Sequence, residues 1–286
     1  MMNKLYGNFW RRKPKNFSSI GQLLLISTLF LGLILSIKGA NSAADSLPIN
    51  LQTLPLPEST RILAADGTPI ADLYQQNRVE VTIDQISKPM QEAIIAIEDS
   101  RFFDHNGIDL RGTIRAYVTN QISGGVVQGG STLTQQYVKN SLVLSAKTPE
   151  EAAAAKEKTI TRKLREMRYA LALERINSKE EILAGYLNIA YFGAGAHGVE
   201  AAAKRYFSKS AKDLTVIEAA TIAGIVQQPT GYDPIRNPAR NENRRNQVLD
   251  RMVSSGYLKA DEAVKLKKIS VKSYLNPTPI RNGCTG

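Results

Sequence analysis

Cysteine and histidine are scarce in this sequence, since its 286 residues include one cysteine and two histidines. One cysteine cannot close an intrachain disulfide, and a zinc site of Cys and His ligands is excluded unless carboxylates do most of the ligating. The sequence also has no internal repeat and lacks the glycine-lysine-serine order of a nucleotide phosphate loop. Disulfide scaffolds, zinc modules and phosphate-loop nucleotide-binding proteins are therefore excluded.

The overall composition fits neither wholesale disorder nor a protein with many membrane spans. Charged residues make up 22% and hydrophobic residues 43%, which are ordinary globular values. The length suits one or two domains. Acidic residues are outnumbered, with 26 Asp and Glu against 37 Lys and Arg, so the formal charge is +11. This excess indicates an anionic partner: nucleic acid, a phosphate-bearing substrate or an anionic membrane surface.

No acidic residue occurs in residues 1–16, a basic tail with five Lys and Arg. The uncharged apolar run at 17–37 matches the roughly 20 residues that a helix needs to cross a bilayer, so we expect a transmembrane anchor there. The positive tail predicts a cytoplasmic N-terminus and an extracytoplasmic (periplasmic) location for the rest of the chain. Ala40 and Ser42 leave a cleaved signal peptide as the alternative, although the run exceeds the roughly 7 to 15 apolar residues usual for one.

The part of the chain after the expected anchor divides by composition into four segments. Residues 38–58 are rich in Ser, Pro and Ala and are expected to be a linker. Residues 59–83 contain Asp66-Gly67 between two apolar stretches, which predicts a β-hairpin. Residues 84–257 are expected to form one mainly helical domain, and residues 258–286 a C-terminal tail.

Helices account for most of the expected structure. Ser87 can cap a helix that begins at Lys88 and Pro89. Met90, Ala93, Ile94 and Ile97 share one face of this helix, which brings Glu98 and Asp99 to the helix end. Residues 150–174 are a long run of strong helix formers. Further helices are expected at 179–191, 198–207, 214–226 and 238–256. We therefore expect a fold of the mainly α class.

The segment IEDSRFFDHNGID places acidic residues at the expected end of the first helix, beside Phe102 and Phe103. A carboxylate next to aromatic rings, such as Glu98 or Asp99, is partly desolvated. Desolvation raises its pKa and suits it to accept a proton from a hydroxyl. A solvated helix end with two core phenylalanines is the alternative interpretation.

A dense polar cluster follows the glycine-rich stretch at 122–130. Its members are Ser131, Thr132, Thr134, Gln135, Gln136, Lys139 and Asn140. Such a cluster can hold a polyhydroxylated ligand and, through Lys139 and backbone amides, a phosphate. The alternative is an ordinary helix start with Ser131 as its N-cap.

The segment ITRKLREMRY can place three charges on one helix face, because Arg162 and Lys163 precede Glu166 by four and three residues. Two cations beside a carboxylate can grip a diphosphate leaving group while the acid assists the transfer. The alternative is a surface ion pair worth roughly a few tenths of a kcal/mol. The two interpretations differ in whether this face meets solvent or a cleft.

Three further polar residues are interpreted as structural. His197 lies in a turn rich in Gly and Ala with no second histidine nearby. Tyr186 and Asn188 are expected to contribute packing and a buried hydrogen bond.

Taken together and in order, these segments resemble the peptidoglycan glycosyltransferase family, the lysozyme-like transglycosylase domain of class A penicillin-binding proteins and of monofunctional transglycosylases. Five blocks carry the resemblance: EDSRFFDHNGID at 98–109, GGSTLTQQYVKN at 129–140, RKLRE at 162–166, KEEILAGYLNIAYFG at 179–193 and RRNQVLDRM at 244–252. Together they cover the chain from about residue 84 to 257. One block would be weak support, whereas five in order are very specific.

The resemblance implies two lobes of packed helices around a cleft, and polymerisation of lipid II. Glu98 would be the general base that deprotonates the acceptor sugar's 4-hydroxyl. That hydroxyl attacks the anomeric carbon of the polyprenyl diphosphate-linked donor chain with inversion, which gives a β-1,4 link. Glu166 would be the second carboxylate, on the donor side, which helps the diphosphate to depart or positions it.

The resemblance also implies binding residues. The diphosphate-binding cations would be Lys139, Arg162 and Lys163. The polar residues of the donor site would be Ser131, Thr132, Gln135 and Gln136. The residues that surround the base would be Asp99, Phe102 and His105. Arg244 and Arg245 match the last block, for which a mainly structural role is expected.

No cofactor is expected to be required, although a divalent cation (Mg²⁺ or Mn²⁺) on the diphosphate is used by some relatives. No metal motif is visible, so such an ion would be held by substrate oxygens and one or two carboxylates. The expected partners are lipid II, the growing glycan, membrane lipids and other cell-wall synthesis proteins, but no nucleic acid.

The sequence differs from bifunctional relatives in one respect, because no Ser-x-x-Lys followed by the other transpeptidase motifs is present. We therefore expect this chain to polymerise glycan but not to cross-link peptides. The hairpin and the Pro-containing tail nevertheless resemble those of a class A protein cut before its second domain more than those of a compact monofunctional enzyme. Two alternatives stay open: a lysozyme-like hydrolase or lytic transglycosylase, and a non-catalytic membrane-anchored scaffold.

Overall fold

The computed structural model describes residues 60–286 except 75, 124–128, 158, 280–282 and 285–286. The basic tail, the expected anchor at 17–37, the linker at 38–58 and most of the glycine-rich stretch lie outside the described residues. Within the part that is described, no helix has the length and apolar character needed to cross a bilayer.

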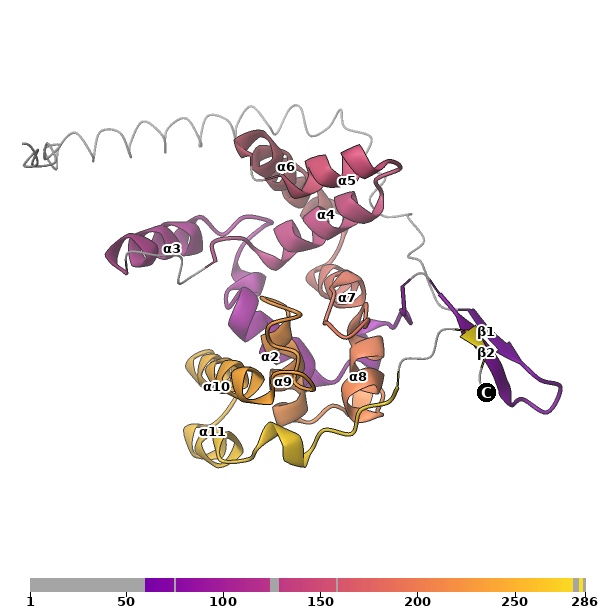
Figure 1. The fold of residues 1–286 in the computed structure, drawn as a ribbon. Coiled ribbons are helices and arrows are strands. Elements are labelled where there is room, and N and C mark those ends of the chain that lie inside the picture. The colour runs from indigo at the N-terminus through magenta and orange to yellow at the C-terminus, as the bar shows by residue number, and fades with distance from the viewer. Residues whose placement is uncertain (1–59, 75, 124–128, 158, 280–282, 285–286) are drawn as a thin grey trace, which may run out of the picture. The chain divides into compact units, whose positions relative to one another are not determined.

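The described residues are mainly helical, as the sequence predicts, with a small sheet (Figure 1). In chain order, with η for a 3₁₀ helix, the elements are β1 (Thr60–Leu63), β2 (Pro69–Leu73), η1 (Ile83–Gln85), α2 (Lys88–Glu98), η2 (Phe102–Asp104), α3 (Leu110–Ile122), α4 (Leu133–Leu144), α5 (Pro149–Lys156), α6 (Ile160–Ile176), α7 (Lys179–Ile189), α8 (Val199–Phe207), η3 (Ala211–Asp213), α9 (Val216–Ile225), α10 (Pro238–Ser254), α11 (Ala260–Lys267), η4 (Val271–Ser273) and β3 (Gly283–Cys284).

The predicted hairpin is confirmed. β1 and β2 pair antiparallel, with Thr60 opposite Leu73. In the turn, the Asp66 side chain accepts hydrogen bonds from the Thr68 backbone N–H at 2.9 Å and from its hydroxyl at 2.6 Å, and Gly67 has φ +83°. The sheet has a third strand that the sequence analysis did not anticipate, because β3 pairs antiparallel with β2.

Side-chain caps set several helix starts. Ser87 caps α2 as predicted, since its hydroxyl accepts from the Met90 N–H at 3.3 Å. The N-cap of α4 is Thr132 rather than Ser131, because Thr132 forms a capping box with Gln135. The run of helix formers at 150–174 is divided between α5 and α6, since Thr159 adopts extended backbone and caps α6.

Two helices lie where the sequence analysis expected none. α3 has a weak apolar pattern, and Ala116 is its one buried residue among those whose burial is described. α11 and η4 fall in the segment expected to be a tail. They contact α10, and Ala263 and Val271 are buried there.

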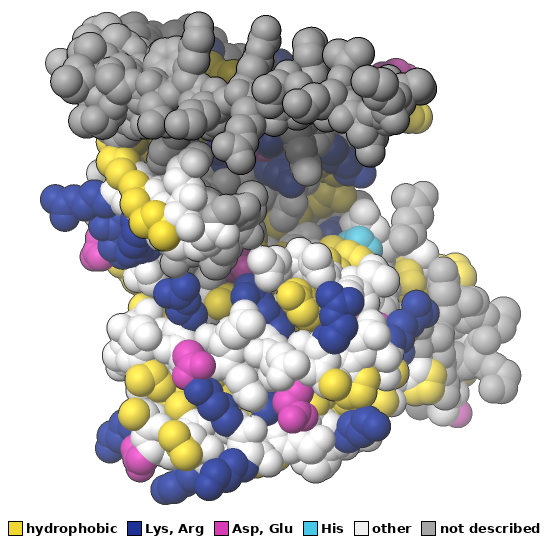
Figure 2. All heavy atoms as spheres, turned by 60° about the vertical axis from the view of Figure 1, so that its left-hand side comes forward, with side chains coloured by type: hydrophobic (Ala, Val, Ile, Leu, Met, Phe, Trp, Pro, Cys, Tyr) yellow, Lys and Arg dark blue, Asp and Glu magenta, His cyan; other side chains and the backbone are white. Residues whose placement is uncertain are grey.

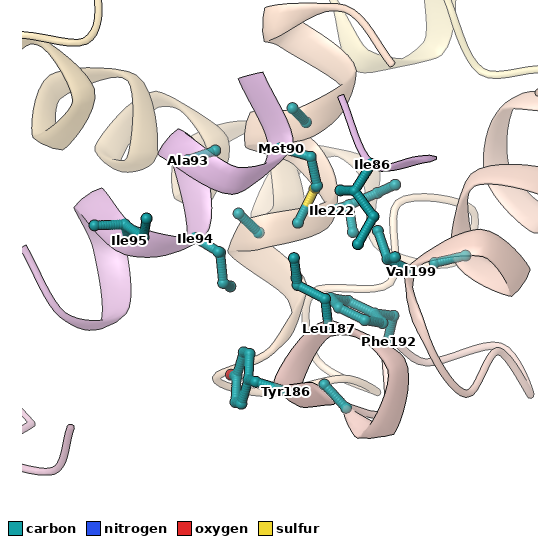
Figure 3. Packing of buried hydrophobic residues seen from close by; sticks show 14 of the residues in the cluster. Ile86, Met90, Ala93, Ile94, Ile95, Tyr186, Leu187, Phe192, Val199 and Ile222 are labelled. Carbon is teal, nitrogen blue, oxygen red and sulfur yellow. The ribbon is translucent and has the colours of Figure 1, made fainter. Parts of the chain in front are cut away.

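The helices form two packed groups (Figure 1). In one, α2, α9 and α10 contact one another; in the other, α4 contacts α5, α6 and α7. Met90, Ala93 and Ile94 of α2 are fully buried, and Figure 3 shows them among other buried apolar side chains. Every residue of α9 except Val216 is buried. Because α2 is packed in this way, its last residue, Glu98, is held in a fixed place.

Replacement of a buried isoleucine on α2 tests this packing. We expect Ile94→Ala to lower the free energy of unfolding by about 2 to 5 kcal/mol, because the side chain is fully buried and a cavity would remain. Ile176→Ala is the matched control, since this isoleucine is 53% exposed and its truncation should cost less than about 0.5 kcal/mol. Denaturant unfolding followed by circular dichroism measures both. Equal losses would contradict the described packing.

Candidate active site

A cleft of about 540 Å³ opens where α2 ends. Its described lining comes from the end of α2, from α3, from residues 129–132, from Gln136 of α4, from Gln227 and from α10. Polar lining residues include Glu98, Asp99, Thr113, Arg115, Ser131, Thr132, Gln136, Gln227, Arg244, Gln247, Asp250 and Arg251. The cleft is therefore strongly polar and contains both carboxylates and guanidinium groups.

Glu98 is the last residue of α2 and is half-buried in this cleft. The Gln136 side-chain amide donates a hydrogen bond to its carboxylate at 2.9 Å. Burial raises the pKa of the Glu98 carboxyl, while the hydrogen bond from Gln136 and the positive charge of Arg244 act in the opposite direction. A carboxylate with a raised pKa at the wall of a cleft is suited to accept a proton from a bound hydroxyl.

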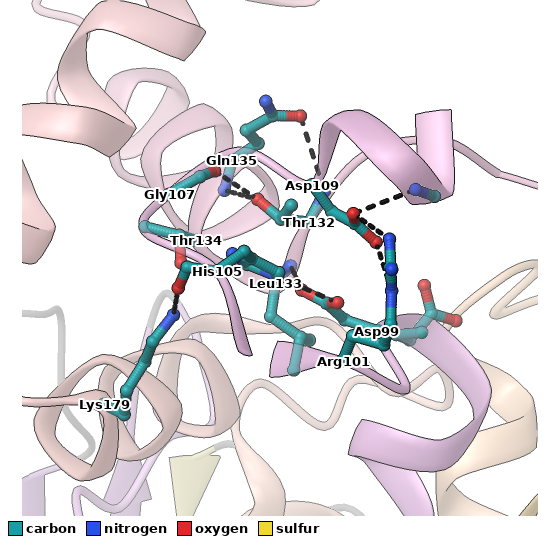
Figure 4. Close-up of polar contacts among 12 residues, drawn as sticks. Asp99, Arg101, His105, Gly107, Asp109, Thr132, Leu133, Thr134, Gln135 and Lys179 are labelled. Atoms are coloured by element: carbon teal, nitrogen blue, oxygen red, sulfur yellow. Dashed lines mark hydrogen bonds and ion pairs between the residues drawn. The ribbon is translucent and has the colours of Figure 1, made fainter. Parts of the chain in front are cut away.

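Asp99 and His105 connect the loop between α2 and α3 to α4 (Figure 4). The Asp99 carboxylate contacts His105 Nε2 at 3.0 Å and accepts from the Leu133 backbone N–H at 3.0 Å. The His105 carbonyl in turn accepts from Lys179 Nζ at 2.6 Å. Both side chains are therefore occupied in shaping the surroundings of Glu98.

The two phenylalanines of this segment have different environments. Phe102 is fully buried beneath Lys179, whose Nζ lies 4.5 Å from the ring centroid. Phe103 is 51% exposed, so the alternative of two core phenylalanines is wrong for one of them.

The rest of the loop is fixed by close contacts (Figure 4). Thr132 Oγ1 donates to the Gly107 carbonyl at 2.7 Å. Gly107 has φ +75°, and a Cβ there would lie 2.8 Å from the Ala170 carbonyl, so this position requires glycine. Arg101 forms an ion pair with Asp109, which also caps α3 by accepting from the Gly112 N–H at 2.8 Å.

A second cluster lies on α6. Arg162 and Lys163 both form ion pairs with Glu166, whose side chain is 3% exposed. The interpretation as a solvated surface pair is therefore wrong for the carboxylate. Lys163 Nζ also donates to Ser131 Oγ at 2.7 Å and to Gln135 Oε1 at 2.9 Å, which joins α6 to the start of α4.

Lys163 has a lower affinity for its proton than an ordinary lysine. Burial, together with the positive charges of Arg162 and Lys139, lowers the pKa of the Lys163 ammonium to about 8. Arg162 and Lys163 share one ion-pair partner, Glu166, so these two cations lie close together.

The structure thus places most of the expected site residues in the cleft or in the α6 cluster, whereas Phe102 and His105 lie in the loop after Glu98. Glu98, Asp99, Ser131, Thr132 and Gln136 line the cleft. The described lining does not include Phe102, His105, Gln135, Lys139, Arg162, Lys163 or Glu166. Ser131 belongs to both places, because it lines the cleft and accepts from Lys163.

Sequence reasoning missed the contribution of α10. The mainly structural role expected for Arg244 stays a prediction, but this residue also lines the cleft, and its positive charge lowers the pKa of Glu98. Its guanidinium donates to Gln247 at 2.9 Å. Arg244, Gln247 and Arg251 are spaced three and four residues apart, and this helical periodicity was the signal that could have found them.

The structural interpretation is confirmed for other residues. Arg245 is fully buried and donates to the Ile269 carbonyl at 2.7 Å and to the Tyr274 hydroxyl at 3.0 Å. Asn188 exchanges two hydrogen bonds with the backbone of Val81, at 2.8 and 3.1 Å.

His197 and Tyr186 also lie in closely packed surroundings. The His197 ring centroid is 4.6 Å from that of Tyr191, and burial lowers the pKa of the imidazole to about 4. Tyr186 is fully buried, but its hydroxyl reaches Gln136 at the cleft.

Basic side chains are not gathered into a single patch on the face in Figure 2, where Lys and Arg are interspersed with Asp and Glu. The case for anion binding therefore depends on the individual cations of α4, α6 and α10. Within the described part of the chain, no group of three or more His, Cys, Asp or Glu side chains could hold a metal ion.

Comparison with known proteins gives consistent relatives. A family model described as transglycosylase matches residues 66–253. Penicillin-binding protein 1F of Bacillus subtilis is 40% identical over 253 residues, which cover 88% of this chain and 33% of the relative. Penicillin-binding protein 1A of Escherichia coli is 41% identical over 198 residues, covering 69% and 22%. The chain thus spans a third or less of the length of these curated relatives.

A crystal structure of penicillin-binding protein 1A from Haemophilus influenzae aligns with 80% of this chain and 22% of its own. The sequence identity is 22% and the TM-score is 0.43.

The titration of Lys163 tests the α6 cluster. After methylation of the lysines with ¹³C-formaldehyde, we expect the Lys163 signal, assigned by its loss in Lys163→Arg, to titrate with a midpoint of about 8. Inorganic pyrophosphate should raise the midpoint, because a neighbouring anion favours the protonated ammonium. NMR across the pH range measures both effects. A midpoint of about 10 or more without added anion, the ordinary range for lysine, would contradict the described burial.

Proposed function

Because this chain belongs to the transglycosylase family, whose domain occurs in class A penicillin-binding proteins, we propose that it polymerises lipid II into β-1,4 glycan strands. The donor is the growing chain on its polyprenyl diphosphate, and transfer proceeds with inversion. The observation that supports the proposal is the position of Glu98. Its carboxyl has a raised pKa and lies at the wall of a polar cleft. Ser131 lines the same cleft and accepts a hydrogen bond from Lys163 of the α6 cluster.

Glu98 acts as the general base in this proposal. It accepts the proton of the acceptor 4-hydroxyl as that oxygen attacks the donor's anomeric carbon, and the bond from this carbon to the diphosphate breaks. A base with a raised pKa is more effective at proton abstraction near neutral pH than an ordinary glutamate. Asp99, Phe102 and His105 hold the loop that follows the base.

Departure of the diphosphate is assigned to the α6 cluster. Arg162, Lys163 and Lys139 neutralise the charge that develops on the leaving group. Glu166 is buried and paired with the first two, so it positions these cations and balances their charge when no substrate is bound. Ser131, Thr132, Gln135 and Gln136 bind the donor sugars and connect the cluster to the cleft.

We assign the acceptor to the α10 side of the cleft, where Arg244, Gln247 and Arg251 lie. The two groups of helices correspond in this proposal to the two lobes of a lysozyme-like fold. The run at 17–37 anchors the chain in the cell membrane once, with the domain on the extracytoplasmic face beside its lipid-linked substrate. Membrane lipids and other cell-wall synthesis proteins are its proposed partners.

A divalent cation has no dedicated cage among the described side chains. The carboxylate nearest the cations, Glu166, already pairs with Arg162 and Lys163. We propose that the enzyme requires no cofactor, and that Mg²⁺ or Mn²⁺, when used, is held chiefly by the diphosphate oxygens.

Two substrates separate polymerisation from hydrolysis. We expect the purified chain to convert lipid II into polymeric glycan and to release no soluble muropeptides from finished peptidoglycan, since cations on a diphosphate have no function at an ordinary glycosidic bond. Gel analysis of glycan products and chromatography of muropeptides measure the two activities. Muropeptides without polymer would establish a hydrolase instead.

Substitution of the base tests the mechanism. We expect Glu98→Gln to reduce lipid II polymerisation by about 10²-fold to 10⁴-fold with the fold retained, because an amide cannot accept the proton. Glu92→Gln is the matched control, since this glutamate lies on the same helix but not in the described lining of the cleft. Polymer yield and melting temperature are measured for both. Unchanged polymerisation in Glu98→Gln would favour a non-catalytic scaffold or a different base.

A further inference from the structure

A line of hydrogen bonds connects a buried tyrosine to the proposed base across three helices. The Tyr186 hydroxyl of α7 donates to Gln136 Oε1 of α4 at 3.3 Å. Gln136 Nε2 donates to the carboxylate of Glu98, at the end of α2, at 2.9 Å. Tyr186 is fully buried, and Figure 3 shows its ring among the apolar core side chains. Its hydroxyl is therefore fixed by the core and not by solvent.

The chemistry of these groups permits one direction of donation. An ionised carboxylate can only accept, so Gln136 must turn its NH₂ group towards Glu98. Its carbonyl oxygen then faces Tyr186, which must donate. Burial and the negative charge of Glu98 raise the pKa of the Tyr186 hydroxyl well above its ordinary value, so the donor proton is retained.

We infer that Tyr186 is a positioning residue for the general base: its hydroxyl fixes the orientation of the Gln136 amide, which in turn holds the Glu98 carboxylate in its ionised form. Among the described contacts, the Gln136 side chain has hydrogen bonds only to these two partners. Without the tyrosine hydroxyl, the amide can rotate, and its oxygen has no donor in a buried site. The catalytic meaning of this inference rests on the proposed function.

Other charges also act on Glu98 and have to be kept constant in any test. Asp99 follows it in the chain, and Arg244, Asp250 and Arg251 face the cleft from α10. Asp109 and Arg115 line the cleft from the start and the body of α3. Tyr186→Phe leaves all of these charges in place, so its effect on Glu98 has to pass through Gln136.

A direct titration of Glu98 tests the inference without depending on catalysis. The full chain in detergent, labelled with ¹³C at glutamate Cδ, gives a Glu98 signal that Glu98→Gln identifies. We expect Tyr186→Phe to raise the midpoint by about half a unit to one unit, as the loss of one hydrogen bond to the ionised form predicts. Gln136→Ala should raise it at least as far, and adding Tyr186→Phe to Gln136→Ala should cause no further shift.

Tyr206→Phe is the matched control. Tyr206 is also fully buried, and its hydroxyl donates at 2.8 Å to the Phe192 carbonyl, outside the described lining of the cleft. We expect Tyr206→Phe to lower the melting temperature by about as much as Tyr186→Phe does, and to leave the titration midpoint of Glu98 unchanged. An unchanged midpoint in folded Tyr186→Phe would overturn the inference, and so would equal shifts in the two phenylalanine variants.

Two further measurements separate the possible failures. If Tyr186→Phe does not fold, the test uses the wild-type protein with ¹³C-labelled tyrosine. The Tyr186 ¹³Cζ signal should then change with pH at the midpoint of the Glu98 titration. A signal that does not change with pH would overturn the inference. With lipid II as substrate, the acidic limb of the rate profile should move upward with the Glu98 midpoint. A wild type that titrates as expected but makes no polymer would refute the proposed function and leave the positioning of Glu98 established.

Discussion

Desolvation of one carboxylate is the constraint on which the described site depends. Glu98 ends a helix in which Met90, Ala93 and Ile94 are fully buried, so the core fixes where its charge must lie. The negative end of the helix dipole and the surrounding protein both oppose ionisation. Gln136 and Arg244, from two other helices, oppose these effects. The proton affinity of Glu98 is therefore set by tertiary packing, and a glutamate on an isolated helix would not have it.

Local patterns predicted the elements that carry their own signals. Ser87 and the apolar spacing of Met90, Ala93 and Ile94 were sufficient to place α2 and its end at Glu98, and Asp66-Gly67 was sufficient for the hairpin. α3 was missed because little of it is buried, and α11 because a short helix that packs through Ala263 leaves little periodicity. Strand β3 has two residues and depends on a partner some 210 residues earlier in the chain, about which local sequence carries no information.

The site was predictable to the extent that its residues are neighbours on one element. Arg162, Lys163 and Glu166 share a helix face, and their ion pairs follow from spacing. The contact of Lys163 with Ser131, and of Tyr186 with Gln136, joins separate helices and could not be derived from spacing. Adjacent arginines make the same point: Arg245 is enclosed by carbonyls and a tyrosine hydroxyl, whereas Arg244 faces the cleft. A rotation of about 100° around the helix separates a structural cation from one at the site.

The meeting of α2, α4 and α7 at Gln136 has a mechanical consequence. The two helix groups contribute different parts of the described site, the base and Arg244 from one and the cations of α6 from the other, and Gln136 bonds across the boundary at 2.9 Å. A hydrogen bond weakens steeply as it lengthens or bends. A displacement of α4 against α2 by a fraction of an ångström would thus be felt by Glu98 as a change in proton affinity. The pKa of Glu98 therefore depends on the spacing between the two helix groups. Strain applied far from the cleft can change this spacing and so alter the reactivity of the site.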